Sequence, residues 1–267
     1  MVKGIDTAAR FYDHSRDWGQ LDEPNAERVR QTLSLLPDGI ATVLDVGCGD
    51  GAVTNPLVEN GLEVTGIDAS EVALAHFRGR PVVGDIEQLP FGDDSFDAII
   101  CAEVLEHLPK RVYARVLPEL ERVARKAIIV STPYREYLPH SFVNCSGCGT
   151  LYHSSHHVRS YRRRDYEQLF SRFALERTLG ICEWRQNPLN VALKHVLGVH
   201  VWRDNLVCPA CDYDRGAPEP RRIRHPVGTE TLKRGLLGLQ TVFERCFPGR
   251  SKSRWIAGLF LPRREAR

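Results

Sequence analysis

The sequence predicts a doubly wound α/β fold built around a mostly parallel sheet. Short runs that are apolar on both faces, such as "ATVLDVG" (41–47) and "FDAIICA" (96–102), alternate with segments of helical periodicity. A glycine-rich turn, "GCGDG" (47–51), follows the first run directly. Buried strands that alternate with helices are typical of a parallel sheet covered on both faces, and right-handed crossovers then give the doubly wound arrangement.

The predicted elements follow one another along the chain. Ser70 is the predicted N-cap of one helix, because its hydroxyl can accept a backbone N–H of the first turn. In the second half, residues 162–184 predict a helix followed by a strand, and "SRWIAGLFLP" (253–262) predicts the last strand. The first half predicts strands at 41–47, 62–68, 81–85, 96–102 and 126–133, with helices at 51–61, 70–79 and 111–125.

These elements divide the chain into a core and two insertions. The core comprises residues 41–184 and 253–262, and residues 1–40 predict an N-terminal helical lid in which Arg10 and Tyr12 are candidates to contact a ligand. The less regular segments 133–160 and 185–252 are the predicted insertions. Helical periodicity recurs in the second of them, at 187–198 and 229–247.

Composition restricts the class of protein. The chain has 267 residues, 42% of them apolar, and no run of eighteen apolar residues that could span a membrane. The N-terminus has no apolar stretch of the kind that a secretory signal needs, so we expect a cytoplasmic protein. Residues 215–267 carry 13 Lys/Arg against 4 Asp/Glu. This excess predicts a solvated basic face, with an anionic partner as the alternative.

Three aspartates mark the ends of successive strands. Asp45 lies two residues before Gly47, where a carboxylate would repel a pyrophosphate but suits a cationic amino-acid group. Asp68 comes 21 residues after Gly47, the position of the acid that binds ribose hydroxyls in nucleotide-binding α/β folds. Asp85, next to Ile86, could accept the exocyclic amine of adenine. The spacing G-x-G-x-x-A does not by itself exclude a dinucleotide.

Four segments together resemble the class I S-adenosylmethionine-dependent methyltransferases. They are "VLDVGCGDG", "GID", "GDIEQLPFGDDSFDAIICAEVLEHL" and "IIVSTP", which cover about residues 35–135. The resemblance implies a Rossmann-like sheet of seven strands with an antiparallel last strand. It implies S-adenosylmethionine as cofactor, held by residues at the strand ends. These residues are Asp45, Gly47, Cys48, Gly49, Asp68, Ala69, Asp85, Ile86 and Cys101, of which the two cysteines are also read as small core residues.

The segment "EVLEH" follows the strand at 96–102 directly. On a helical turn Glu103, Glu106 and His107 could face one point and hold a divalent cation such as Mg²⁺. The segment is similar to the ubiquinone-pathway O-methyltransferases and to the small-RNA 3′-terminal 2′-O-methyltransferases. The similarity to the RNA enzymes implies His157 as a further ligand, with His156 and His153 as substitutes. The alternative is a metal-free turn that lines the pocket.

Two C-x-x-C pairs, "CSGC" (145–148) and "CPAC" (208–211), lie in the predicted insertions. The four thiolates of Cys145, Cys148, Cys208 and Cys211 form the ligand set of a structural Zn²⁺ site, which would clip the two insertions together. The 59 residues between the pairs exceed the usual spacing of a zinc ribbon. A redox pair, unrelated buried thiols, or a site with His153 in place of one sulfur are the alternatives.

The function predicted first is O-methylation of a hydroxylated small molecule, such as a sugar or a catechol-like ring, with metal assistance and His107 as a candidate base. The second hypothesis is an RNA 3′-terminal 2′-O-methyltransferase, although no RNA-binding module is recognisable. The third is a non-catalytic cofactor-binding scaffold. The tail around Trp255 could also make peripheral membrane contact, but the resemblance favours a buried last strand there.

Overall fold

The computed structural model describes residues 21–145, 147–186, 201–202, 207–211 and 250–263. The predicted lid residues Arg10 and Tyr12, the helical patterns at 187–198 and 229–247, and most of the basic C-terminal quarter lie outside the described residues. The chain divides into two compact units. The first comprises Met1–Glu136, Val158–Cys182 and Ser253–Arg267, and the second comprises Tyr137–His157 and Glu183–Lys252.

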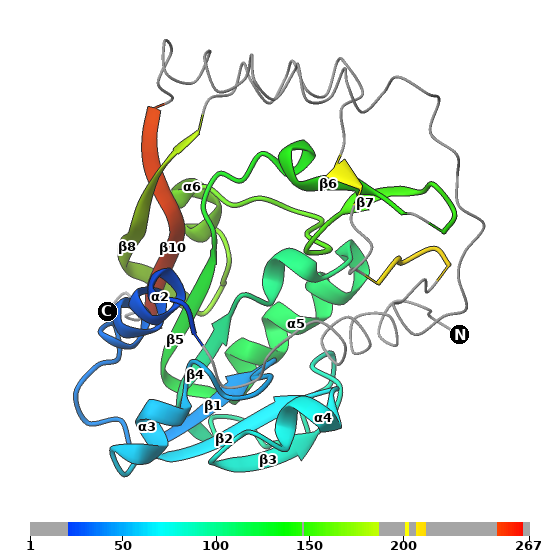
Figure 1. The fold of residues 1–267 in the computed structure, drawn as a ribbon. Helices are drawn as coiled ribbons and strands as arrows, with labels where there is room; N and C mark the ends of the chain where they lie inside the picture. Colours follow the sequence, from blue (N-terminus) through cyan, green and yellow to red (C-terminus); the bar gives the residue numbers. More distant parts are fainter. Residues whose placement is uncertain (1–20, 146, 187–200, 203–206, 212–249, 264–267) are drawn as a thin grey trace, which may run out of the picture. The chain divides into compact units, whose positions relative to one another are not determined.

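A seven-stranded sheet forms the centre of the first unit (Figure 1). The strand order is β3-β2-β1-β4-β5-β10-β8. β10 runs antiparallel to β5, whereas β3, β2, β1, β4 and β5 pair in parallel. The strands are β1 (Thr42–Val46), β2 (Glu63–Asp68), β3 (Arg80–Val83), β4 (Phe96–Ala102), β5 (Ala124–Pro133), β8 (Phe173–Gln186) and β10 (Arg250–Pro262). The predicted fold, including the antiparallel final strand, is confirmed.

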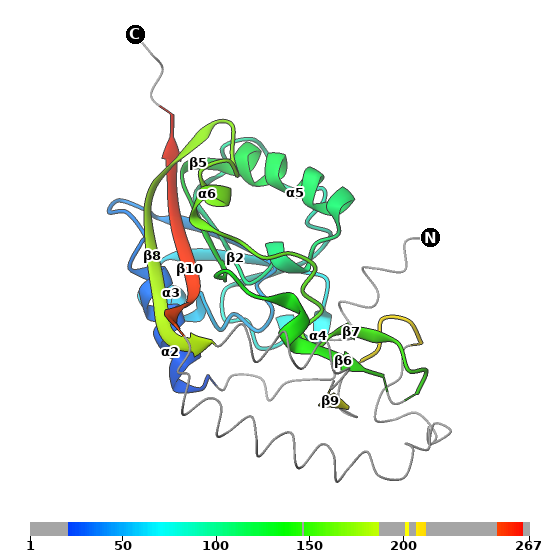
Figure 2. The same ribbon diagram turned by 90° about the horizontal axis from the view of Figure 1, so that it is seen from above.

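Alternate side chains of each central strand enter two separate apolar layers. On β4, Ile99 and Cys101 pack in one layer, while Ala98 and Ile100 pack in the other. Helix α5 (Lys110–Val123) and the short α6 (Arg163–Tyr166) cover the first layer, and α2 (Glu23–Leu33), α3 (Asn55–Glu59) and α4 (Glu71–Leu74) cover the second (Figure 2). A strand with apolar neighbours on both faces has no polar side to alternate, which explains the continuous apolar runs.

Helix α4 is shorter than the predicted helix at 70–79. Ser70 caps it as expected, with its hydroxyl accepting the N–H of Ala73 at 3.1 Å. Beyond Leu74 the side chain of Asn55 bonds to the backbone in place of helical hydrogen bonds. Its amide donates to the carbonyl of His76 at 3.4 Å and accepts the N–H of Arg78 at 2.8 Å. These bonds satisfy backbone groups that a longer helix would have paired internally, so the chain can turn early into β3.

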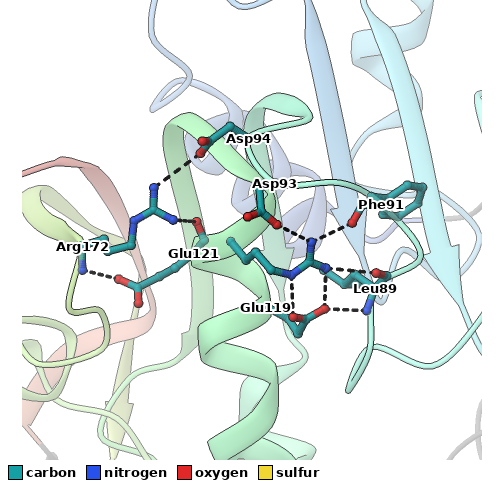
Figure 3. A network of polar contacts seen from close by, with 8 residues as sticks. Leu89, Phe91, Asp93, Asp94, Glu119, Glu121 and Arg172 are labelled. Atoms are coloured by element: carbon teal, nitrogen blue, oxygen red, sulfur yellow. Dashed lines mark hydrogen bonds and ion pairs between the residues drawn. The ribbon is translucent and has the colours of Figure 1, made fainter.

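A polar network holds the connection between β3 and β4 against α5 (Figure 3). The Arg122 guanidinium donates to the carbonyl oxygens of Phe91 at 2.7 Å and Leu89 at 3.1 Å, and it forms ion pairs with Asp93 and Glu119. Glu119 in turn accepts the N–H of Leu89 at 2.8 Å. Next to this group, Arg172 bonds to Asp94 and Glu121. The connection that carries Asp85 and Ile86 is therefore fixed to the core.

At each point where the chain leaves the first unit, the residues before and after the departing segment contact each other. The N–H of Arg135 donates to the carbonyl of Tyr161 at 2.7 Å, across the excursion Tyr137–His157. A Cβ atom on Gly180 would lie 2.3 Å from the Ser253 hydroxyl, so β8 and β10 are in close contact at the start of the excursion Glu183–Lys252. Both excursions thus begin and end at neighbouring points of the sheet.

The second unit contains a small sheet of order β7-β6-β9, which the sequence did not predict. β6 (Phe142–Asn144) pairs antiparallel with β7 (Leu151–His153) and parallel with β9 (Val201–Trp202). A short 3₁₀ turn, η2 (Leu138–Ser141), precedes β6. Among the described residues of the second unit, the buried cluster consists of Val143, Cys145, Tyr152 and Cys208. Within the part of the chain that the structure describes, no helix of either unit has the length and apolarity needed to cross a membrane.

Candidate functional site

The glycine-rich turn after β1 is tight enough to require glycine. Gly47 has φ of +72°, and a Cβ atom there would lie 2.6 Å from Cγ2 of Val104. Gly51 has φ of +76°, and its Cβ would lie 2.5 Å from Cδ2 of Phe77. The N–H of Gly47 donates to the carbonyl of Ile67 at 2.8 Å, which ties the turn to β2. The backbone of this turn can therefore come close to a ligand without side chains in between.

Asp68 joins the end of β2 to this turn. One of its carboxylate oxygens accepts the N–H of Gly49 at 2.8 Å, and the other accepts the N–H of Ser70 at 2.9 Å. Each carboxylate oxygen has two lone pairs, so the same group can also accept hydroxyl donors from a ribose. Ala69, the next residue, is exposed beside it.

Asp45 is buried, with 2% of its surface exposed, and its carboxylate accepts the hydroxyl of Thr54 at 2.7 Å. The pKa of Asp45 is raised to about 7, mainly by burial; the Thr54 bond lowers it, and the neighbouring carboxylates of Asp68 and Asp50 raise it. A cationic group placed next to Asp45 would favour its ionised form, so the residue is suited to an ammonium or sulfonium ligand.

Asp85 and Ile86 stand at the start of the connection that α5 anchors. Asp85 is exposed and accepts the N–H of Glu87 at 2.8 Å, and Ile86 is half-buried against the core. Cys48 packs against the glycine of β2, since a Cβ on Gly66 would lie 2.6 Å from its Sγ. Cys101 is fully buried in the apolar layer under α5. For both cysteines this geometry favours the packing role over ligand contact.

The segment "EVLEH" does not form the single helical turn that the sequence predicted. Only Leu105–His107 form a 3₁₀ turn, while Glu103 lies before it with φ of +58°. The two Glu103 oxygens accept the Ser131 hydroxyl at 3.0 Å and the indole N–H of Trp255 at 2.9 Å. The expectation that Glu103 shares one turn with Glu106 and His107 is therefore wrong, because the left-handed residue directs its carboxylate to β5 and β10.

Glu106 and His107 do lie together. A carboxylate oxygen of Glu106 and a ring nitrogen of His107 are within 4.8 Å of each other. Glu106 is 1% exposed, and among the described residues neither of its oxygens has a hydrogen-bond partner. Burial raises the pKa of Glu106 well above its usual range, and the Glu103 carboxylate adds to the effect. A buried carboxyl without a partner is costly, so a ligand that binds it would lower the free energy of the site.

Comparison with known proteins shows a family for the segment that contains these residues. Residues 44–130, which run from β1 to β5, match the methyltransferase domain family Methyltransf_11. Residues 44–130 form a methyltransferase domain of this family. It is similar to the ubiquinone biosynthesis O-methyltransferases of Albidiferax ferrireducens (30% identity over 120 residues) and Thiobacillus denitrificans (34% over 121 residues).

Each of these matches covers 41% of this chain and only 48% and 51% of the two relatives. Among solved structures, the fold is similar to that in the complex between the Haloferax volcanii Trm112 methyltransferase activator and its methyltransferase. The TM-score is 0.52 at 16% identity, over 90% of this chain and 92% of that one. At this identity the likeness concerns the fold alone.

Two residues of the first unit that the sequence analysis did not assign to the site lie beside "EVLEH". The Trp255 indole from β10 bonds to Glu103, and the buried Arg28 guanidinium from α2 lies 5.6 Å from the Trp255 ring. Arg28 also favours the ionised form of Glu106. The only local signal for Arg28 is its helical spacing with Thr32, which is buried on the same face of α2.

The three candidate histidines belong to the second unit. The rings of His153 and His157 stack with centroids 4.7 Å apart, and Nδ1 of His153 accepts the N–H of His157 at 3.2 Å. Nε2 of His156 bonds to the carbonyl of Val207 at 2.9 Å. Because His157 and Glu106 belong to different units, the role of His157 as a metal ligand stays a prediction. The four cysteines predicted as zinc ligands also come together in this unit.

Proposed function

We propose that this protein transfers a methyl group from S-adenosylmethionine to a hydroxyl oxygen of a small molecule. The observation that carries the proposal is the row of carboxylates at the ends of β1, β2 and β3 around a glycine turn, within a domain of the methyltransferase family. Ligands of open α/β sheets bind at this carboxyl edge. The relatives named above act as O-methyltransferases in ubiquinone biosynthesis, which supports oxygen as the acceptor and a hydroxylated ring as the substrate class.

Each residue of the row would have a separate role toward the donor. Ionised Asp45 and the turn Gly47–Gly49 would hold its cationic amino-acid portion. Asp68, already fixed by two backbone N–H groups, would accept the ribose hydroxyls, and Asp85 with Ile86 would contact the adenine. The donor supplies an electrophilic methyl group: the acceptor oxygen forms the new O–C bond as the C–S bond breaks, and the hydroxyl proton leaves to a base. His107 is the proposed base where it does not hold a cation, and a neighbouring histidine would take the proton where it does.

A divalent cation would be held by Glu106 and His107, with His157 as a predicted third ligand. The unpartnered, buried carboxylate of Glu106 fits such an ion, since a cation would stabilise its ionised form. Glu103 is not included, because its carboxylate is directed toward Ser131 on β5 and Trp255 on β10. A bound cation would lower the pKa of an acceptor hydroxyl that it contacts.

Calorimetry with S-adenosylmethionine tests the donor site. We expect wild-type binding and a loss of about tenfold or more in Asp68→Asn, which keeps the shape but removes the charge that ribose hydroxyls bond to. Glu63→Gln, at the exposed start of the same strand, is the matched control and should bind normally. No heat of binding in the wild type would overturn the proposal.

A turnover assay that detects S-adenosylhomocysteine, with catechols, sugars and RNA oligonucleotides as acceptors, tests the reaction. Methylation of RNA 3′ ends alone would replace the small-molecule acceptor, and donor binding without turnover on any acceptor would indicate a scaffold. Metal assistance is tested separately: after EDTA treatment and return of Zn²⁺, activity should reappear only with added Mg²⁺ or Mn²⁺. Full activity in Glu106→Gln without added metal would contradict it.

A further inference from the structure

The four cysteines of the second unit have the geometry of a tetrahedral sulfur site. One ligand atom from each of Cys145, Cys148, Cys208 and Cys211 lies within 4.8 Å of all the others. The Sγ atoms of Cys145 and Cys211 are 3.6 Å apart, and those of Cys148 and Cys208 are 3.7 Å apart. Four sulfurs at about 2.3 Å from one Zn²⁺ are about 3.8 Å from each other. All four are in the thiol form and none of them is part of a disulfide.

The backbone around each pair supplies a second, independent observation. The N–H of Gly147 donates to Sγ of Cys145 at 3.3 Å, and the N–H of Ala210 donates to Sγ of Cys208 at 3.4 Å. The two C-x-x-C segments therefore repeat the same bond from residue i+2 to the first sulfur. An N–H directed at sulfur stabilises the thiolate, which is the form that binds metal. A thiol that only fills a core does not need this bond.

The neighbouring histidines are engaged elsewhere. Nδ1 of His153 accepts the N–H groups of Ser155 and His157, and Nε2 of His156 bonds to the carbonyl of Val207, the residue before Cys208. The alternative in which His153 replaces one sulfur is thus not favoured. With sulfur at all four positions, a bound ion would have no open position for substrate or water, so its role would be structural.

We propose that Cys145, Cys148, Cys208 and Cys211 bind one Zn²⁺ that holds the second unit together. A bound ion would add to the stability of the described part of this unit, whose sheet has strands of three, three and two residues over a buried cluster of four side chains. Two of these four, Cys145 and Cys208, are themselves zinc ligands. The ion links two segments about 60 residues apart in the chain, and closing a loop of that length without a cross-link is entropically unfavourable. Metal binding and folding of the unit are then the same event.

Metal analysis of the full-length protein, purified without added metal, tests the proposal. We expect one zinc per chain in the wild type. Cys148→Ser removes an exposed ligand without emptying the core, and Cys145→Ser removes a buried one. Both should lose most of the zinc. Cys182→Ser is the matched control, since Cys182 lies outside the cluster and bonds to the carbonyl of Pro24. It should keep one zinc per chain.

Exchange of zinc for Co²⁺ gives a readout that does not depend on activity. Tetrahedral cobalt thiolate should show intense charge-transfer and ligand-field absorption in the wild type and in Cys182→Ser, and this absorption should be absent from Cys148→Ser. Zinc that persists in the cysteine variants, a wild type with iron in its place, or cobalt spectra of octahedral oxygen ligation would each overturn the proposal. None of these results depends on methyl transfer, so failure of one proposal leaves the other standing.

Discussion

The described parts of the two units have buried apolar clusters of very different size. In the first unit, a seven-stranded sheet has one continuous apolar layer under α5 and another under α2, α3 and α4. In the second, the described sheet is three short strands with a buried cluster of four residues. The core of the first unit can stabilise it without a ligand, whereas the described part of the second has a cluster too small to do so and would gain from a cross-link. Under the zinc proposal, the same chain uses hydrophobic burial in one region and metal ligation in the other.

Removal of zinc should have the largest effect of all, because it should destabilise the second unit and leave the first unchanged. After chelation we expect backbone amides of β6 and β7 to lose almost all protection from hydrogen exchange, because their only described core includes two of the ligands. Amides of β4 and β5 should keep theirs. Mass-spectrometric exchange measured before and after chelation, with zinc returned as the control, follows both regions at once. Equal loss in both would show that the units do not differ in this way.

Truncation of a core side chain of the first unit should destabilise that unit and leave the zinc site of the second unit unchanged. Ile99 is fully buried on β4, and Ile99→Ala removes its contacts under α5 and leaves a cavity. We expect the first unit to lose about 2–5 kcal/mol of unfolding free energy, while the zinc content stays at that of the wild type. The matched control is Val72→Ala, at an exposed position of α4, which should change stability by about 0.5 kcal/mol or less.

The buried Asp45 should make the stability of the first unit depend on pH. Its pKa is about 7 in the folded protein, mainly through burial, and lower in the unfolded chain. Between about pH 4 and 7 the folded state therefore binds more protons, so unfolding free energy should fall as pH rises, by a few kcal/mol at most. Urea unfolding at several pH values measures this slope. In Asp45→Asn the slope should flatten, and an unchanged slope would assign the dependence to other groups.

The same group should give donor binding the opposite pH dependence. Ionised Asp45 is the form that suits the cationic donor, so affinity for S-adenosylmethionine should increase as pH rises through about 7. Calorimetry in buffers of different ionisation enthalpy would detect the proton released on binding. Asp45→Asn should bind weakly at every pH. Tighter binding at pH 5 than at pH 8 in the wild type would contradict this role.

The smallest effect is expected at the connection between β3 and β4. Arg122→Met removes the bonds to Leu89, Phe91 and Glu119, and we expect a loss of about 1–2 kcal/mol, because the guanidinium is only partly buried. Donor affinity should fall several-fold, since Asp85 and Ile86 lose their anchor. Arg115→Met, which breaks only the more exposed pair with Glu87, is the control. Equal thermal melting and binding in the two variants would show that the network does not position the connection.

The parts of the fold that the sequence predicted are those with local signals. β4 was predicted with its observed bounds, because its apolar run is continuous and polar residues flank it. The glycine turn was identifiable, since left-handed φ at Gly47 and Gly51 restricts the residue type. The Arg122 network was not, because it joins residues about thirty positions apart through single contacts.

Within the candidate site, the prediction failed where tertiary contacts decide the backbone. Glu103 adopts a left-handed conformation that its sequence neighbours do not require, and the bonds to Ser131 and Trp255 hold it there. Asn55 shortens α4 from a different helix. The small sheet of the second unit was missed, because strands of two or three residues are too short to show periodicity.

The contacts at the two points where the chain leaves the first unit have a consequence for how the chain folds. The hydrogen bond between Arg135 and Tyr161, and the close contact of Gly180 with Ser253, place the start and end of each excursion next to each other. The long segment between β8 and β10 therefore leaves the sheet and rejoins it at neighbouring strands. We expect the strands of the first unit to pair during folding whether or not zinc has reached the second unit.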